Sequence, residues 1–286
     1  MISAYEKIAV IGAGTMGNGI AHVFAQAGYN VHLIDVSPES LTKALATIGG
    51  NIDRQIKKEV LTLADKDRIL GAIHTHTTLA EGVEGCALVI EAATENVELK
   101  LKIFKELDTL CSRDTILATN TSSISISLIG SVTQRSSQVI GMHFMNPVPV
   151  MKLVEIIRGY NTSDTVLQAI VALTQDLGKT PEMSEDYPGF VANRILMPMI
   201  NEAIWTLHEG VATREAIDSV MRLGMAHPMG PLQLADFIGL DVCLAILRVL
   251  HDGFGNPKYA PCPLLVNMVT AGHLGKKSNK GFYSYM

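Results

Sequence analysis

The chain has 286 residues, of which 48% are hydrophobic and 18% are charged, and its net charge is −5 at pH 7. This length and composition indicate a globular protein of one large or two ordinary domains, and the acidic balance argues against nucleic-acid binding. No apolar run is long enough for a membrane span, and the four dispersed cysteines form no metal or disulfide pattern, so we expect a cytoplasmic protein without a metal.

The first predicted elements are an apolar strand over residues 8–11 and an alanine-rich helix over residues 15–27, joined by a glycine-rich turn. Gly12 permits the tight turn, Gly14 lets the backbone approach a pyrophosphate, and Gly17 allows close packing of helix on strand. The N-terminus of the helix favours a bound anion. The predicted phosphate site comprises Gly12, Gly14, Thr15, Met16 and Gly17.

A second apolar run, over residues 31–34, ends at Asp35. An acidic residue at this distance from the turn accepts hydrogen bonds from the ribose hydroxyls of an adenosine. Its charge repels the additional phosphate of NADP, and the residues that follow supply no arginine to bind that phosphate. The sequence therefore favours NAD(H), while FAD, which uses a similar turn, stays open at this point.

The remaining elements follow an alternating strand and helix pattern, which then gives way to helices. A charged, helix-prone stretch over about 37–70 predicts an inserted helical hairpin. Further strands are expected over residues 87–90, 115–118, 139–142 and 153–157, with helices over 94–110 and 162–177, and then over 190–208, 213–223 and 232–250. The pattern predicts a Rossmann-type doubly wound α/β sheet in residues 1–183 and a smaller all-α domain in residues 184–286.

His143 is the first candidate for proton transfer. It follows the strand predicted over residues 139–142, and ligands of open α/β sheets bind beyond the carboxyl ends of strands. Imidazole can exchange a proton with a hydroxyl group near neutral pH. Glu155 lies in an otherwise apolar strand, where an unpaired carboxylate is costly. We expect Glu155 to pair with His143 and fix its tautomer; the alternative is an edge strand on which Glu155 faces water.

Two polar segments lie where they can face the same site. Asn120 and Ser122 follow the strand predicted over residues 115–118, and Asn193 opens the first helix of the second domain. These side chains offer hydroxyl and amide groups for hydrogen bonding, and the alternative for each segment is a turn that caps a helix.

Seven motifs, in order and along nearly the whole chain, resemble the single-function L-3-hydroxyacyl-CoA dehydrogenases, including the bacterial 3-hydroxybutyryl-CoA enzymes. They are Ile-Gly-Ala-Gly-Thr-Met-Gly (11–17), Glu-Ala-Ala-Thr-Glu (91–95), Thr-Asn-Thr-Ser-Ser (119–123), His-Phe-Met-Asn-Pro-Val (143–148), Asp-Tyr-Pro-Gly-Phe-Val-Ala-Asn-Arg (186–194), Gly-Pro-Leu-Gln-Leu-Ala-Asp-Phe-Ile-Gly-Leu-Asp (230–241) and Gly-Lys-Lys-Ser-Asn-Lys-Gly-Phe-Tyr (275–283). Jointly these motifs are specific.

The resemblance implies oxidation of the 3-hydroxyl group of an L-3-hydroxyacyl-CoA with NAD, or the reverse reduction with NADH. It implies His143 as the acid–base group, Glu155 as its orienting partner, and Ser122 and Asn193 on the substrate oxygens. It adds Glu95, Lys100, Asn120, Ser122, Asn146 and Lys277 to the cofactor residues, and it implies Asn51 and Lys58 as contacts of CoA. The resemblance also implies an acyl-CoA substrate and a homodimer formed through the helical domain. The lack of a long apolar run predicts no membrane partner.

Two other functions remain open at this stage. An NAD-dependent sugar-acid dehydrogenase, such as L-gulonate 3-dehydrogenase, shares this architecture and a His/Glu pair, but its substrate has no CoA moiety to engage Lys58. A non-enzymatic NAD-binding protein of the lens-crystallin type needs no intact catalytic pair, and fold alone does not settle function.

Overall fold

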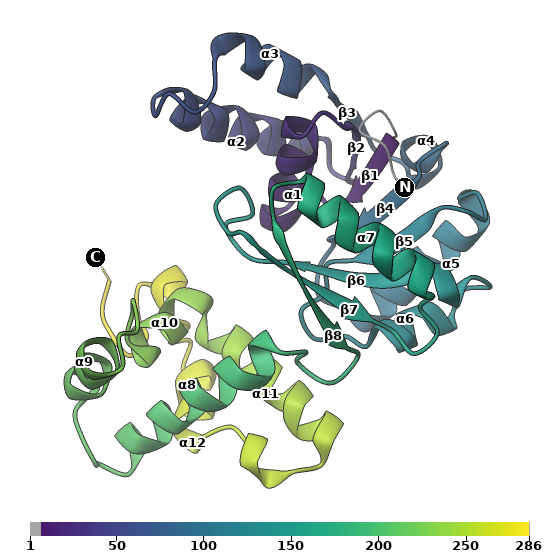
Figure 1. Ribbon diagram of the computed structural model, residues 1–286. Coiled ribbons are helices and arrows are strands. Elements are labelled where there is room, and N and C mark those ends of the chain that lie inside the picture. Colours follow the sequence, from purple (N-terminus) through teal and green to yellow (C-terminus); the bar gives the residue numbers. More distant parts are fainter. Residues whose placement is uncertain (1–6, 286) are drawn as a thin grey trace. The chain divides into compact units, whose positions relative to one another are not determined.

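The computed structural model describes residues 7–285, which divide into two compact units between Asp186 and Tyr187. Unit 1 contains an eight-stranded sheet in the order β3-β2-β1-β4-β5-β6-β7-β8 (Figure 1). Its strands are β1 (Lys7–Ile11), β2 (Asn30–Ile34), β3 (Ile73–His76), β4 (Leu88–Glu91), β5 (Ile116–Thr119), β6 (Val139–Phe144), β7 (Leu153–Arg158) and β8 (Thr180–Glu185). The order, in which β1 and β4 are adjacent, is that of a Rossmann-type sheet.

Helices pack on both faces of this sheet. The helices of unit 1 are α1 (Thr15–Gln26), α2 (Pro38–Ile56), α3 (Leu63–Gly71), α4 (Leu79–Val83), α5 (Val97–Leu110), α6 (Ile126–Ser131) and α7 (Asp164–Asp176). Alternate residues of β2 show the two faces, because side chains of a strand point alternately to either side. Val31 and Leu33 join the core formed with α1, α2, α3 and α7, whereas Ile34 contacts Gly82 of α4.

The helical hairpin expected over about 37–70 corresponds to α2 and α3. Ser37 caps α2 by accepting a hydrogen bond from the Ser40 N–H at 3.1 Å, and Pro38 occupies the first helical turn. Thr62 and Asp65 form a reciprocal capping box that begins α3. The local sequence therefore determines where both helices start.

The sheet is parallel except where β7 pairs antiparallel with β6. Residues 145–152 connect these two strands directly, and a connection of this length contains no crossover helix that would return the chain parallel. The reversal has a consequence for the site, because it makes His143 and Glu155 register partners on neighbouring strands.

The two edge strands, β3 and β8, were absent from the predicted strands. β3 has the sequence Ile-His-Thr-His and β8 has Thr-Pro-Glu-Met-Ser-Glu, and both are largely polar. Edge strands tolerate polar residues and proline because one side bonds no neighbour, so they lack the apolar runs of central strands. β8 extends past residue 183, where the domain boundary was predicted, and keeps residues 184–186 with unit 1.

Unit 2 is helical. Its helices are α8 (Ala192–His208), α9 (Arg214–Gly224), α10 (Pro231–Ile238), α11 (Leu240–Phe254) and α12 (Pro263–Thr270). The single helical pattern over 232–250 is two helices, because Gly239, with φ of +105°, ends α10 and turns the chain into α11. α8, α10, α11 and α12 enclose a core of its own.

Candidate active site

The glycine turn between β1 and α1 is built as its sequence predicts. Gly12 has φ of +96°, and a Cβ atom there would lie 2.7 Å from the Ala92 carbonyl oxygen. A Cβ atom on Gly17 would lie 1.7 Å from the Gly12 oxygen, so both positions exclude a side chain. A Cβ atom on Gly14 would meet nothing within 4 Å, which leaves the space beside the turn open to a ligand.

The N-terminus of α1 fits an anion. Gly14 is its N-cap residue, no side chain caps the helix in the part of the chain that the structure describes, and the first turn contains no acidic residue. The first-turn N–H groups of Thr15 and Met16 are therefore available to a phosphate oxygen. These features, together with the open space beside Gly14, fit the pyrophosphate of a dinucleotide.

A cavity of about 370 Å³ adjoins this turn, and one face of α2 forms its opposite wall. Asn51 and Asn146, predicted for the substrate and the cofactor respectively, both line it. Lys43 also lines it and was not among the predicted site residues. The complete lining is Ala13, Gly14, Thr15, Asn18, Gly19, Ser40, Lys43, Ala44, Thr47, Asn51, Asn146, Pro147, Val148 and Pro149. The helical spacing of Ser40, Lys43 and Thr47 was the available signal, because it places them on one helix face.

Asp35 holds the glycine turn and lines a second cavity. Its carboxylate accepts hydrogen bonds from the Ala13 N–H at 2.8 Å and the Ser37 N–H at 2.9 Å. The cavity measures about 460 Å³ and has apolar walls that include Ile34, Leu79 and Ile103. A carboxylate beside an apolar slot is suited to the ribose and base of an adenosine.

A buried ion pair ends β4. The Glu91 carboxylate is fully buried and accepts hydrogen bonds from Lys100 Nζ at 2.6 Å, the Ala93 N–H at 2.7 Å and Thr119 Oγ1 at 2.7 Å. Lys100 is 1% exposed, and its ammonium group lies 3.4 Å from Glu95 Oε2. The structure therefore gives Lys100 protein partners, and its direct contact with the cofactor stays a prediction.

Glu95 organises the loop that carries Ser122. Its Oε1 accepts hydrogen bonds from Thr121 Oγ1 at 2.7 Å, the Ser122 N–H at 3.0 Å and Ser123 Oγ at 3.1 Å. Burial opposes ionisation of Glu95, but the charge of Lys100 and these hydrogen bonds outweigh it, so the pKa of Glu95 is lowered. Glu95 therefore carries a negative charge that positions Ser122.

Asn120 links this loop to β6. Its Oδ1 accepts a hydrogen bond from the Phe144 N–H at 2.9 Å, and its own N–H donates to the Glu91 carbonyl oxygen at 2.7 Å. Asn120 was predicted to bind the cofactor; in the structure its side-chain oxygen holds the strand residue next to His143. That prediction stays untested.

His143 and Glu155 form a pair in which the carboxylate is buried and the imidazole is partly buried. His143 lies within β6, one residue before its end, and its Nδ1 is 2.8 Å from Oε2 of Glu155 on β7. The two side chains are 12% and 4% exposed. A carboxylate at Nδ1 fixes the tautomer with the proton on Nδ1.

The other predicted residues lie at the end of α2 or in unit 2. Lys58 is exposed just after α2. Asn193 is buried in the first turn of α8, where its N–H donates to the Gly189 carbonyl oxygen at 3.1 Å. Lys277 pairs with Asp241 at 2.6 Å, and its role at the cofactor stays a prediction.

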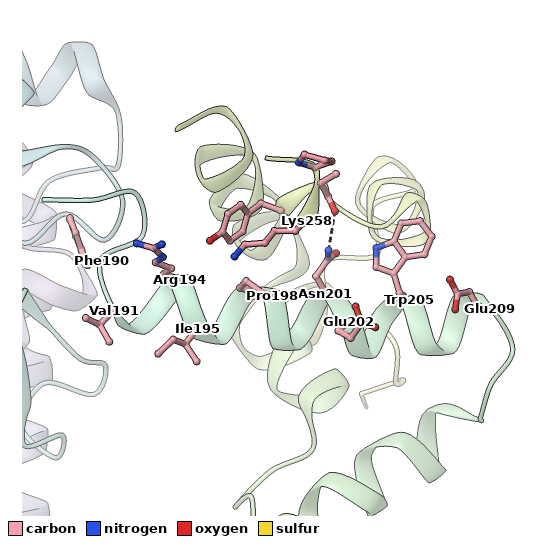
Figure 2. Close-up of a pocket in the computed structure, with 13 residues that line it drawn as sticks. Phe190, Val191, Arg194, Ile195, Pro198, Asn201, Glu202, Trp205, Glu209 and Lys258 are labelled. Atoms are coloured by element: carbon pink, nitrogen blue, oxygen red, sulfur yellow. Dashed lines mark hydrogen bonds between the residues drawn. The ribbon is translucent and has the colours of Figure 1, made fainter. Parts of the chain in front are cut away.

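Unit 2 also contains a cavity of about 970 Å³ along α8 (Figure 2). Arg194, Asn201 and Trp205 project from the helix, and Lys258 faces them from the segment that follows α11. Asn201 Nδ2 donates to the Ala260 carbonyl oxygen at 2.9 Å and fixes that segment. None of the predicted site residues lines this cavity.

A histidine held by a carboxylate in the same domain as a glycine turn of this kind fits a nicotinamide-dependent dehydrogenase. Family comparisons agree. The model described as 3-hydroxyacyl-CoA dehydrogenase, NAD binding domain, matches residues 7–187, and that of the C-terminal domain matches residues 189–285. The chain therefore belongs to the 3-hydroxyacyl-CoA dehydrogenase family.

Individual relatives span the whole chain. It is 53% identical over 285 residues to the 3-hydroxybutyryl-CoA dehydrogenase of Bradyrhizobium diazoefficiens, which covers 100% of this chain and 97% of that protein. It is 40% identical over 286 residues to human mitochondrial hydroxyacyl-coenzyme A dehydrogenase, with 98% and 91% covered. The crystal structure of (S)-3-hydroxybutyryl-CoA dehydrogenase from Ralstonia eutropha matches at a TM-score of 0.96 and 51% identity over 99% of both chains. The chain is an NAD-dependent dehydrogenase that acts on 3-hydroxyacyl-CoA.

Proposed function

We propose that this enzyme interconverts L-3-hydroxybutyryl-CoA and acetoacetyl-CoA, with His143 as the acid–base group. The observation that carries the proposal is the 2.8 Å contact of His143 Nδ1 with the buried Glu155 carboxylate. The four-carbon substrate is supported by the Bradyrhizobium and Ralstonia relatives, both of which are named for it.

In the oxidising direction, His143 Nε2 removes the proton of the substrate 3-hydroxyl group while hydride leaves C3, so that the C–O bond becomes a carbonyl. Bound NAD supplies the hydride acceptor. Glu155 stabilises the imidazolium that forms and keeps the ring in orientation. In the reducing direction, the same Nε2 returns its proton to the oxygen on C3.

We assign Ser122 and Asn193 to the substrate oxygens. Support for Ser122 comes from Glu95, which fixes its backbone N–H at 3.0 Å and lies 3.3 Å from its hydroxyl oxygen. A substrate held in one orientation reacts faster because the entropy of alignment is lost on binding, before the reaction. Asn193 is assigned by family resemblance.

Residues of unit 1 would hold the two nucleotide ligands. The glycine turn, Thr15 and Met16 would bind the NAD pyrophosphate, Asp35 the adenosine ribose, and Glu95 and Asn146 the remainder. Asn51 and Lys58 would contact CoA. Asn51 accepts a hydrogen bond from Arg54, which orients its amide on the cavity wall.

The proposal is tested by NADH oxidation with acetoacetyl-CoA, alongside NADPH and a control with gulonate and NAD. We expect rapid oxidation of NADH that depends on acetoacetyl-CoA. Turnover of gulonate without turnover of acetoacetyl-CoA would assign the enzyme to sugar acids. NADH binding without turnover of either substrate would indicate a binding protein.

We also propose that two copies associate through unit 2. Val220 and Leu223 of α9 are 59% and 77% exposed, although both are apolar. Val220 lines a cavity of about 390 Å³ whose apolar lining also includes Ile217 and Met221, and Leu223 follows Val220 by three residues in the same helix. Exposed apolar patches of this kind mark protein interfaces. Light scattering should show a dimer that Leu223→Glu dissociates and that Tyr160→Glu, at an exposed position in unit 1, leaves intact.

We place the enzyme in the cytoplasm. All four cysteines, Cys86, Cys111, Cys243 and Cys262, are buried and free. Burial raises the pKa of Cys86 and Cys243 to about 12, which suppresses the reactive thiolate. Free buried thiols are usual in a reducing compartment. Within residues 7–285, no helix combines the length and apolar character needed to cross a membrane.

A further inference from the structure

Lys179 is a buried cation outside the residues discussed so far. It lies in the turn between α7 and β8 and is 9% exposed. Its ammonium group donates to the carbonyl oxygens of Val148 and Met151, both at 2.7 Å. Among the described residues, no carboxylate forms an ion pair with it, and burial lowers its pKa. Lysine is rarely buried without a carboxylate partner.

The two carbonyl groups belong to the loop over residues 145–152, between β6 and β7. Asn146, Pro147, Val148 and Pro149 form one wall of the 370 Å³ cavity that adjoins the glycine turn. The Val148 side chain is 2% exposed and packs on α1, where a Cβ atom on Gly19 would lie 2.8 Å from the Val148 Cβ. Lys179 therefore binds two carbonyl groups of a loop that also forms a wall of the cavity at the glycine turn.

A methionine would fill the same space without the cost of removing an ammonium group from water. What only the lysine contributes is its charged donors, which bind two carbonyl groups at fixed positions. Proline at residues 147 and 149 supplies no N–H group, so these two residues cannot anchor the loop by donated backbone bonds. The buried charge therefore has a specific effect, which is to hold this loop.

We propose that Lys179 is a positioning residue for cofactor binding, because its ammonium group fixes residues 146–149 as the wall of the cavity at the glycine turn. The inference rests on the proposed function only in that NADH is the cofactor. Lys179 acts through the loop and does not touch the cofactor. Its removal should weaken NADH binding more than it slows turnover at saturating NADH.

The experiment compares Lys179→Met with Lys152→Met, an exposed lysine at the end of the same loop. We expect Lys179→Met to raise the Kd for NADH about tenfold, while kcat falls by no more than about threefold. Hydrogen–deuterium exchange over residues 145–152 should be faster in the variant than in the wild type. Lys152→Met should leave the Kd, kcat and exchange unchanged. If Lys179 contributed only to stability, Lys179→Met would lower the melting temperature without raising the Kd for NADH more than it lowers kcat.

The proposal is overturned by a folded Lys179→Met protein with the wild-type Kd for NADH, or by exchange over residues 145–152 that is unchanged by NADH in the wild type. The second measurement needs no variant, so it can overturn the proposal even if Lys179→Met does not fold. A wild-type protein that fails to bind NADH overturns this inference and the proposed function together. A wild-type protein that reduces acetoacetyl-CoA, beside a variant with unchanged affinity, overturns the inference about Lys179 alone.

Discussion

His143 and Glu155 are register partners across the antiparallel pair of β6 and β7, and their side chains meet at 2.8 Å between two mostly apolar strands. The pairing depends on the antiparallel direction of β7, because the direction and register of β7 determine which of its residues lies beside His143. A single antiparallel strand in a mainly parallel sheet thus gives the histidine its carboxylate partner.

Glu155→Gln should lower kcat for acetoacetyl-CoA by about 10²–10³-fold, because the amide no longer stabilises the imidazolium. NADH affinity should not change. Glu182→Gln is the matched control, since Glu182 is the register partner of Glu155 on β8 and is exposed. Steady-state kinetics measure both variants, and a kcat for Glu155→Gln close to that of Glu182→Gln would remove Glu155 from the mechanism.

Asp35→Ala should raise the Kd for NADH at least about tenfold. Two losses contribute. The variant lacks the carboxylate that would accept hydrogen bonds from the ribose, and it lacks the acceptor of the Ala13 N–H, which lies at 2.8 Å. Affinity for acetoacetyl-CoA should change far less, and discrimination against NADPH should decrease with the negative charge gone. Fluorescence titration measures these affinities, with the exposed Asp114→Ala as control. Unchanged NADH affinity would show that Asp35 does not hold the ribose.

Glu91 and Lys100 should show strong energetic coupling. Each single variant, Glu91→Gln or Lys100→Met, leaves the other charge buried and should lower the free energy of unfolding by about 3 kcal/mol. The double variant should be less destabilised than the sum of the two, by at least about 1 kcal/mol. Urea unfolding measures all four proteins of the cycle. Strictly additive losses would mean that the 2.6 Å contact carries no coupling.

The free energy of unfolding should decrease as the pH is lowered from 6.5. His22 and His32 are buried, and desolvation by burial is the largest cause that lowers the pKa of each from 6.5 to about 4; for His32, the nearby His76, Lys7 and His74 add to it. In the unfolded chain both take up a proton near pH 6.5, whereas the folded protein does so only near pH 4. Acid therefore favours unfolding across this window and has no such effect above it.

Each histidine of this kind adds at most about 1.4 kcal/mol per pH unit to the slope of the free energy of unfolding against pH within the window. His32→Leu should reduce the slope, whereas His208→Gln, at an exposed position, should not. Urea unfolding at intervals from pH 7 to pH 4 measures the slope. The same slope in His32→Leu and the wild type would contradict the assignment of His32.

The sequence is informative where a residue type has few alternative uses. Three glycines followed by Asp35 predicted the turn between β1 and α1. Gly12 and Gly17 lie where a side chain would clash with the backbone, and Gly14 leaves space open to a ligand. Glu155 stood out because a carboxylate inside an apolar strand needs a partner. The central strands were recognisable for the same reason, since burial on both faces demands unbroken apolar runs.

Tertiary contacts determine the features that were missed. In the sequence, Glu91 resembles the charged end of a strand and Lys100 resembles a surface residue of a helix. Only the tertiary structure buries them together. Lys179 follows a helix-terminating Gly178 and looks like an ordinary polar turn. The spacing of Lys43 from Ser40 and Thr47 places it on one helix face, but only the tertiary structure shows that this face meets the cavity at the glycine turn. The polar edge strands β3 and β8 pair with neighbours that local sequence does not identify.

The role of His143 in catalysis is tested by His143→Gln, assayed for both NADH affinity and turnover of acetoacetyl-CoA. Glutamine keeps the polarity of the position and cannot exchange a proton at neutral pH. We expect a Kd for NADH near the wild-type value and a kcat lower by about 10³-fold or more. A variant that retains most of its turnover would contradict the assignment of His143 as the acid–base group.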